Sequence, residues 1–260
     1  HQAHLQQVAR INHTSINFRS LSFYGTRTRA QRRRRENKMA NVRRLGADTG
    51  MLAMQESWLN KNDSTALKGV LPEHQLFYSN SVKGGHLGCI TAAGPSVTGD
   101  YTLRQIPTPA KLRGRAVLVA GTHKSGGENF LTLNVHLPHK AAQRLKFLRI
   151  LRKWKELGGV GRKYVLGDMN FVLQAADTSS GSQDLVSKAF RREWEEFEGW
   201  LGLTEIDQPT HTWFQVGKEL QTGKSCRLDR IYISMDEAEI AVNQPYAFIA
   251  ACPFLSLITH

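Results

Sequence analysis

Short runs of apolar residues, many alternating with polar ones, recur along most of the 260-residue chain. A period of two residues, interrupted by Gly, Pro, Asn and Asp, is typical of β-strands whose two faces differ in polarity. The pattern therefore predicts strands over residues 15–24, 49–55, 86–92, 101–106, 115–121, 129–137, 163–168, 227–234 and 245–250.

Other segments repeat their apolar residues every three or four positions, which is the spacing of one helix face. They run from Arg29 to Leu45, from Lys140 to Leu157 and from Leu185 to Leu201. Glycine-rich turns such as SVKGG and HKSGGEN join several strands directly, which favours hairpins over a purely parallel sheet. We expect an α/β (α+β) protein with two mostly antiparallel sheets and helices outside. Residues 14–260 would form one domain behind an extension of residues 1–13.

The charge is unevenly balanced, with 35 Lys and Arg against 22 Asp and Glu, a formal net charge of +13. Such an excess favours a polyanionic partner, nucleic acid first and an anionic membrane second. No apolar run reaches the roughly 18 to 20 residues that span a bilayer, so no membrane segment is predicted. The three cysteines form no Cys-x-x-Cys pair, which favours a reducing, intracellular compartment and argues against a structural zinc site.

Candidate catalytic groups stand where an apolar strand ends or its rhythm breaks. They are Asn17, Glu56, Asn134, His136, Asp168, Asn170 and Asp229. Each alone is more often structural, because a glutamate at a strand end commonly faces solvent and Gly-Asp is a common turn. Their order along the chain carries more weight than any one of them.

Read together, these stretches resemble the endonuclease/exonuclease/phosphatase superfamily, which is DNase I-like. The motifs are Asn17, Gln55-Glu56, Asn134-Val135-His136-Leu137-Pro138, Gly167-Asp168-Met169-Asn170, PTHTW at 209–213 and Arg227-Leu228-Asp229. The match extends from about Ile16 to Ser234. The resemblance implies a four-layered sandwich of two sheets flanked by helices, with a site where strand ends converge at one edge.

The resemblance also implies phosphodiester hydrolysis with a divalent cation. Oxygen ligands select Mg²⁺ or Mn²⁺ for such chemistry. By family position Glu56 would be the main metal ligand, with Asn17 beside it. Asp168 would orient or deprotonate the attacking water.

Further roles follow by family position. Asn170 would hold the phosphate, and His136 would donate a hydrogen bond to a non-bridging oxygen or to the leaving group. Asn134 would brace the site from behind. Asp229 would pair with a catalytic histidine and set its tautomer.

The chain departs from the family pattern at that histidine. Relatives carry Ser-Asp-His at the start of the last strand, and no such triplet occurs here. His260 lacks the preceding Ser-Asp and is not assigned this role. We expect the last strand to be missing from this sequence and to lie in a longer polypeptide, which puts the activity of this piece in question. A second departure is Arg19, where some relatives have an aspartate that helps to bind the metal.

A basic stretch, RTRAQRRRRENK, follows the Asn17 strand and favours nucleic acid as the substrate. The arginines in question are Arg32, Arg33, Arg34 and Arg35. At the start of a helix they oppose the helix dipole, so contact with a phosphate backbone is one reason for them. A solvated basic face or a nuclear-localisation patch explains them equally well. Arg227 is a further candidate DNA contact.

The reading that follows is a Mg²⁺-dependent endonuclease that nicks DNA, similar to the apurinic-type endonuclease domains of non-LTR retroelements. Such domains are followed by a reverse transcriptase. The partner would be DNA, with RNA as an alternative, and the compartment would include the nucleus. Two other functions fit the same residues: a small-molecule or lipid phosphoesterase, and a non-catalytic nucleic-acid-binding remnant.

Overall fold

The protein folds as two β-sheets packed face to face, described by a computed structural model over residues 11–17, 28–57, 61–80, 88–179, 186–208, 211, 213–214, 225–236 and 239–240. The smaller sheet has the order β1-β2-β4-β3. Its strands are β1 (His13–Asn17), β2 (Met51–Gln55), β3 (Gln75–Asn80) and β4 (Gly88–Ala93).

The larger sheet has the order β5-β6-β7-β8-β12-β9. Its strands are β5 (Tyr101–Ile106), β6 (Ala116–His123), β7 (Phe130–His136), β8 (Arg162–Asp168), β9 (Thr204–Glu205) and β12 (Asp229–Ile233). A separate two-stranded ribbon pairs β10 (Trp213–Phe214) with β11 (Ser225–Cys226). In the sheets β1 runs parallel to β2 and β7 parallel to β8, while the other pairs are antiparallel. The mostly antiparallel arrangement predicted from the turns is confirmed.

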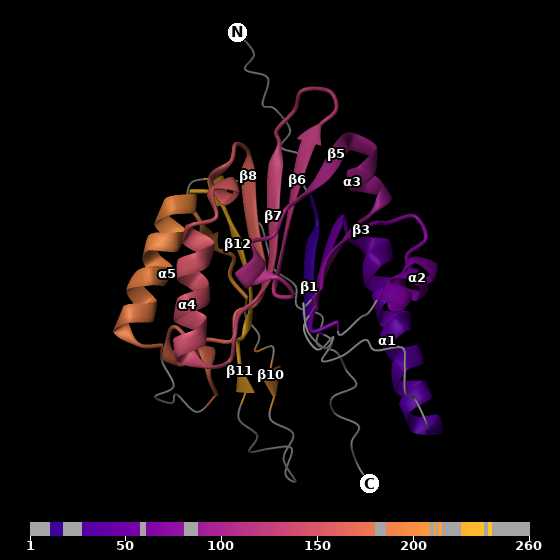
Figure 1. Ribbon diagram of the computed structural model, residues 1–260, viewed down its shortest axis with the longest axis horizontal. Helices are drawn as coiled ribbons and strands as arrows, with labels where there is room; N and C mark the ends of the chain where they lie inside the picture. The colour runs from indigo at the N-terminus through magenta and orange to yellow at the C-terminus, as the bar shows by residue number, and fades with distance from the viewer. Residues whose placement is uncertain are drawn as a thin grey trace.

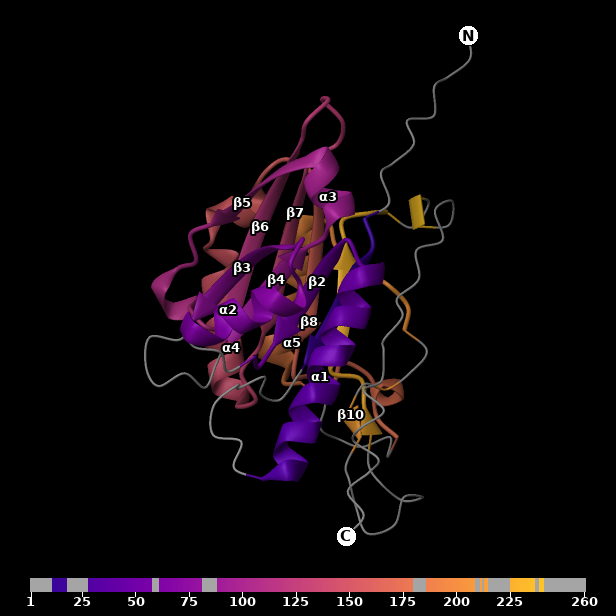
Figure 2. The same ribbon diagram turned by 90° about the vertical axis from the view of Figure 1, so that its right-hand side faces the viewer.

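Helices cover the outer face of each sheet, giving four layers (Figure 1). The helices are α1 (Arg29–Asp48), α2 (Lys61–Val70), α3 (Pro95–Asp100), α4 (Ala141–Arg152) and α5 (Lys188–Leu201). Short 3-10 turns are η1 (Ala110–Leu112), η2 (Lys155–Gly158) and η3 (Ala175–Asp177). Helices α1 and α2 lie beside the smaller sheet, and α4 and α5 beside the larger one (Figures 1 and 2).

Three apolar clusters hold these layers together. Val117 and Val119 point between the two sheets, whereas Leu118 between them points outward beneath α4 and α5. This alternation is the physical origin of the period-two pattern. Val42 of α1 belongs to the third cluster, between the helices and the smaller sheet.

The predicted elements differ from the structure in a few places. The helix predicted over 140–157 ends at Arg152, because Trp154 takes an extended conformation that turns the chain toward β8. Trp154 and Leu157 remain buried nonetheless. Part of the strand predicted over 15–24 and all of that over 245–250 lie outside the described residues. Neither α2 nor β3 was predicted.

Within the described residues, no helix is long and apolar enough to cross a membrane.

Candidate active site

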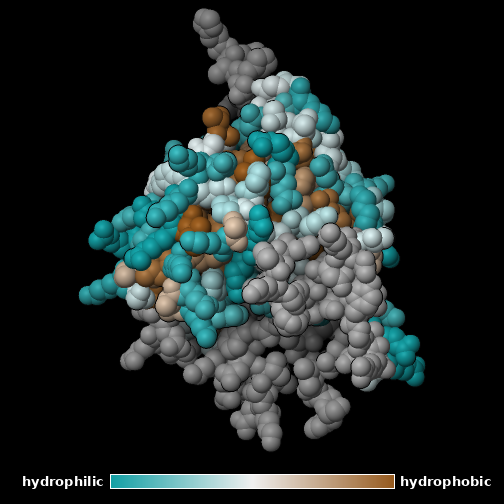
Figure 3. Space-filling view, viewed as in Figure 1, coloured by the Kyte–Doolittle hydropathy of each residue, from teal (hydrophilic) through white to brown (hydrophobic). Residues whose placement is uncertain are grey.

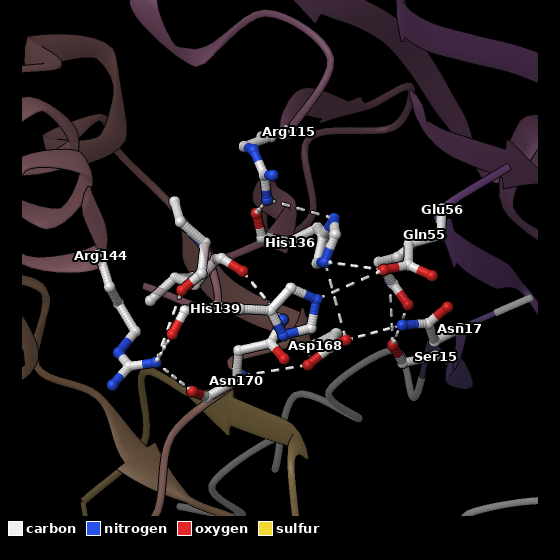
Figure 4. A network of polar contacts seen from close by, with 12 residues as sticks. Ser15, Asn17, Gln55, Glu56, Arg115, His136, His139, Arg144, Asp168 and Asn170 are labelled. Carbon is white, nitrogen blue, oxygen red and sulfur yellow. Dashed lines mark hydrogen bonds and ion pairs between the residues drawn. The ribbon is translucent and has the colours of Figure 1, made fainter. Parts of the chain in front are cut away.

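The site residues meet because strand register brings several strand ends to the same end of both sheets. Asn17 of β1 lies opposite Gln55 of β2, and Glu56 follows Gln55 directly. His136 lies opposite Asp168 in β7 and β8, and Asp229 lies opposite Asp168 from the other side. Figure 4 shows Asn17 and Glu56 from the smaller sheet pointing toward His136 and Asp168 from the larger one.

Two residues at this end have left-handed backbone conformations. Glu56 has φ +49° and Asn170 has φ +51°. Such conformations cost of order 1–3 kcal/mol for residues other than glycine, least for Asn, and they cluster at functional sites. The turn after Glu56 is tied down by Ser57, whose backbone N and Oγ both donate to the carbonyl of Gly88 at 3.0 and 3.1 Å. The surrounding structure thus holds the Glu56 carboxylate in place.

Gly167 is required by the close approach of β7 to β8. Its φ is +145°, and a Cβ atom there would lie 1.9 Å from the carbonyl oxygen of Val135. No side chain fits at that distance. The glycine therefore lets Asp168 follow directly on a strand that is packed against β7.

The Asp168 carboxylate accepts hydrogen bonds from both sides. Asn17 Nδ2 donates to Oδ2 at 2.6 Å, which links the two sheets, and the backbone N of Asn170 donates to Oδ1 at 3.0 Å. Burial raises the pKa of Asp168 well above its usual value, and the nearby Asp229 carboxylate raises it further. A carboxylate with a raised pKa is a stronger base than an exposed one.

Glu56 lies beside two histidines. Its Oε1 is 3.3 Å from His136 Nε2 and 3.8 Å from His139 Nε2. Burial lowers the pKa of His136 to about 3, with further lowering by Arg115 and His139. His136 is therefore a neutral imidazole at physiological pH.

Asn134 occupies the interface between the two sheets behind the site. Its Oδ1 accepts from Gln55 Nε2 at 2.7 Å, and its Nδ2 donates to the carbonyl of Ile90 at 2.8 Å. Gln55 Nε2 also contacts Ser15 Oγ at 3.1 Å. This buried polar network fixes β2 and β7 relative to each other.

Asn170 is held on two sides by its own neighbourhood. Its Nδ2 donates to the carbonyl of Leu137 at 2.8 Å, and Arg144 Nη1 donates to its carbonyl and to that of His139. The amide nitrogen proposed to hold a phosphate is thus engaged within the protein. The bond to Leu137 uses one of the two N–H groups of this nitrogen, and the second could donate to a phosphate.

The donor atoms at this end fit a hard divalent cation. Asp168 and Glu56 supply carboxylate oxygens beside the Asn17 amide, and oxygen donors suit Mg²⁺ or Mn²⁺. The raised pKa of Asp168 reflects carboxylates crowded into a buried place, where a cation would offset their repulsion. Glu56, His136 and His139 also place one ligand atom each within 4.8 Å of one another.

The predicted DNA-contacting arginines lie away from this cluster. Arg32 and Arg33 are exposed on α1, whose first turns project at the end of the molecule toward which β1 runs (Figures 1 and 2). For Arg34 and Arg35 the backbone alone is described. Hydrophilic residues cover this projecting end of α1 in Figure 3.

Arg227 is engaged inside the protein. Its Nε and Nη2 donate to Asp177 Oδ1 at 3.0 and 2.6 Å, and its side chain is 11% exposed. These bonds engage much of the Arg227 guanidinium within the protein, together with a bond from Nη1 to the carbonyl of Gln208. The DNA contact of Arg227 stays a prediction.

Arg115, His139 and Arg144 are site residues that the sequence reasoning did not assign. His139 follows the Asn-x-His-Leu-Pro motif directly, so its position beside that motif could have suggested it. Arg115 has no such signal, because its contact with His136 arises only from the pairing of β6 with β7.

No protein-family model and no curated protein sequence matches this chain. Solved structures do match its fold. The endonuclease domain of TRAS1, a telomere-specific non-LTR retrotransposon, aligns with a TM-score of 0.59 and 12% identity over 89% of this chain and 88% of that domain. The AP endonuclease of Leishmania major aligns with a TM-score of 0.62 and 15% identity over 86% of this chain and 79% of that one. The 3'-5' exonuclease of Neisseria meningitidis aligns with a TM-score of 0.60 and 18% identity over 86% of this chain and 87% of that one. The chain shares its fold with these solved nucleases, and it is the layered fold that the resemblance implied.

Proposed function

We propose that the protein is a divalent-metal-dependent phosphodiesterase that nicks DNA, as an endonuclease of the retroelement type would. The observation that carries this proposal is the meeting of Asn17, Glu56, His136 and Asp168 at one end of the paired sheets. These residues come from four different strands or strand ends. Superfamily members with solved structures include AP endonucleases and a retrotransposon endonuclease domain, which supports this class of activity.

The chemistry assigns a role to each of these groups. Glu56 and Asn17 would hold Mg²⁺ or Mn²⁺, which supplies positive charge against the phosphoryl oxygens. Asp168 would accept a proton from the attacking water at a carboxylate oxygen, since burial strengthens it as a base. His136 would donate a hydrogen bond from Nε2 to a phosphoryl oxygen. Asn170 would position the phosphate, and Asp229 would pair with a histidine, as its family position implies.

The charge distribution supports DNA as the substrate. Between residues 101 and 155, which include β5, β6, β7 and α4, Glu128 is the single acidic residue in the sequence. Arg32 and Arg33 add exposed positive charge on α1, on the other sheet. A strand of nucleic acid that reaches the site would thus meet basic surface on both sides.

Supercoiled plasmid provides the test. With Mg²⁺ the protein is expected to convert it to relaxed circles, and removal of the ion with a chelator is expected to stop the reaction. Glu56→Gln and Asp168→Asn should each slow relaxation by at least about 100-fold, because each removes a charge that acts on the transition state.

Asp100→Asn is the matched control, because it removes one exposed carboxylate from α3. It should relax plasmid at the wild-type rate. Salt-sensitive binding without relaxation would instead support the nucleic-acid-binding remnant. Phosphate release from a soluble inositol phosphate, with plasmid untouched, would support the small-molecule phosphoesterase.

A further inference from the structure

The two ring nitrogens of His136 face opposite kinds of groups. Nδ1 lies 3.4 Å from Nη1 of Arg115, and Nε2 lies 3.3 Å from Glu56 Oε1 and 3.8 Å from Asp168 Oδ2. The ring is 1% exposed. One nitrogen thus meets a hydrogen-bond donor, and the other meets acceptors (Figure 4).

Arg115 and His136 are also fixed to each other through the backbone. His136 N donates to the carbonyl of Arg115 at 2.9 Å, and Arg115 Nη1 donates to the carbonyl of His136 at 3.2 Å. This double link holds the guanidinium against the Nδ1 side of the ring. Arg115 stands in the turn directly before β6, and its backbone link to His136 extends the pairing of β6 with β7 by one step.

The chemistry of the two groups decides which nitrogen carries the proton. A guanidinium has N–H donors and no acceptor, so Nδ1 must offer it a lone pair. A ring whose Nδ1 offers a lone pair is neutral, and its one N–H lies on Nε2. Nε2 makes no hydrogen bond of good geometry within the described residues, so this N–H can serve a ligand.

We propose that Arg115 is a positioning residue that fixes His136 as the Nε2–H tautomer. His136 then presents a neutral hydrogen-bond donor to the site and offers no lone pair to a metal ion. Its use on a phosphoryl oxygen rests on the function proposed above, whereas the tautomer does not.

The proposal separates two ways of binding a cation. A site built from Glu56, His136 and His139 would require the Nε2 lone pair, and the proton would then move to Nδ1. There it would point at the N–H groups of Arg115, leaving two buried donors facing each other. A cation held by carboxylate and amide oxygens, without His136, avoids this conflict.

Nitrogen NMR of the full chain tests the tautomer directly. In protein with ¹⁵N-labelled histidine, the His136 signals are those missing from a His136→Gln sample. A protonated ring nitrogen resonates well upfield of an unprotonated one. We expect Nε2 at the protonated position and Nδ1 at the unprotonated position in the wild type. The reverse assignment in the wild type would overturn the proposal, whatever the variants do.

Variants show whether Arg115 is the cause. Arg115→Met should shift the His136 nitrogens toward the other tautomer, whereas Arg115→Lys, which keeps a charged donor, should retain the wild-type signals. Arg113→Met removes the same charge from an exposed neighbour and should leave them unchanged. Wild-type signals in Arg115→Met would refute the role of Arg115.

Zn²⁺ titration and nicking kinetics complete the test. Added Zn²⁺ should leave Nε2 protonated, and conversion of Nε2 to a metal-bound nitrogen would overturn the proposal. In plasmid nicking, Arg115→Met should lower kcat at least about tenfold with little change in KM, since a lost transition-state donor lowers kcat. If wild-type protein fails to nick, the proposed function is wrong. The tautomer proposal is then still decided by the NMR assignment alone.

Discussion

At the scale of single residues, the site is built where the backbone takes conformations that most side chains avoid. Glu56 and Asn170 have positive φ. Position 167 has to be glycine because β7 leaves no room there for a side chain. The cost of such conformations must be offset by the packed sheets around them. A glycine directly before Asp168 is thus a structural requirement of this site.

Gly167→Ala should unfold or strongly destabilise the protein. The added methyl would lie 1.9 Å from the Val135 carbonyl oxygen, on a backbone with φ +145°. Either β7 and β8 separate or the turn to Asp168 shifts, and we expect a loss of at least about 3 kcal/mol in the free energy of unfolding. Urea denaturation followed by circular dichroism measures this loss.

Gly199→Ala is the control for that substitution. Gly199 lies within α5, and nothing approaches its position within 4 Å. An alanine there should stabilise the helix by about 0.5–1 kcal/mol. Equal stability of the two alanine variants would show that the contact between Gly167 and Val135 is not as close as described.

Glu198→Gln should change how stability depends on pH. Burial raises the pKa of Glu198 to about 7 in the folded protein, with Glu205 adding to the shift, against 4.5 in the unfolded chain. Between pH 4.5 and 7 the unfolded chain loses this proton while the folded protein keeps it, so the wild type loses stability as the pH rises. Glutamine removes this loss, about 2 kcal/mol after allowance for partial exposure.

Denaturation midpoints at pH 4.5 and pH 8 check this effect. Glu198→Gln should gain stability relative to wild type at pH 8 and gain little at pH 4.5. Glu195→Gln makes the same change at an exposed position of α5 and should follow the wild type at both values. A constant difference between Glu198→Gln and wild type across this range would contradict a buried, protonated Glu198.

At the scale of elements, the sequence predicted strands whose two faces differ and missed elements whose pattern is weak. Val117, Leu118 and Val119 alternate between two apolar layers, so period and burial agree. Helix α2 (KNDSTALKGV) has few apolar residues to repeat, and β3 (QLFYSN) is short. That the motif residues lie near one another was predictable, because each stands at a strand end and strand ends share one edge. The contact of Arg115 with His136 depends on strand register, which the sequence does not display.

Asp177→Asn should destabilise the protein by uncoupling η3 from β12. Asp177 Oδ2 accepts from Arg230 Nη2 at 2.5 Å, and Asp177 Oδ1 accepts from Arg227. Arg230 is 1% exposed and would keep Glu205 as its acidic partner. Because the substitution leaves two largely buried arginines with Glu205 as their one remaining acidic partner among the described residues, we expect a loss of about 3 kcal/mol, measured by chemical denaturation.

Glu196→Gln is the matched control, because it removes an acidic partner of Arg152 at the protein surface. Solvent screens such pairs, so no measurable change in stability is expected. If both variants lose the same amount, charge loss in general would explain the result, and the buried position of Asp177 would have no special part in it.

At the scale of the whole molecule, Arg32 and Arg33 are exposed on α1 beside the smaller sheet, and the segment 101–155, with one acidic residue, supplies β5, β6 and β7 of the larger sheet. The candidate site lies where both sheets end. Under the proposed function, positive charge on both sheets would attract a polyanion, and the buried carboxylates would hold a cation at the site. The groups that would attract the substrate are then separate from those that would act on it.

Arg32→Gln/Arg33→Gln should weaken binding to a DNA duplex and reduce its dependence on salt. Each arginine that contacts a phosphate releases counterions, so losing both should lower the slope of log affinity against log salt by about 1.8. Arg43→Gln/Arg44→Gln removes the same charge from exposed positions near the other end of α1 and should change the slope less. Fluorescence anisotropy with a labelled duplex at several salt concentrations measures both. Equal slopes for the two variants would show that net charge alone attracts DNA. A smaller slope for Arg32→Gln/Arg33→Gln would place the phosphate backbone along the first turns of α1, on the side of the molecule where the strand ends meet.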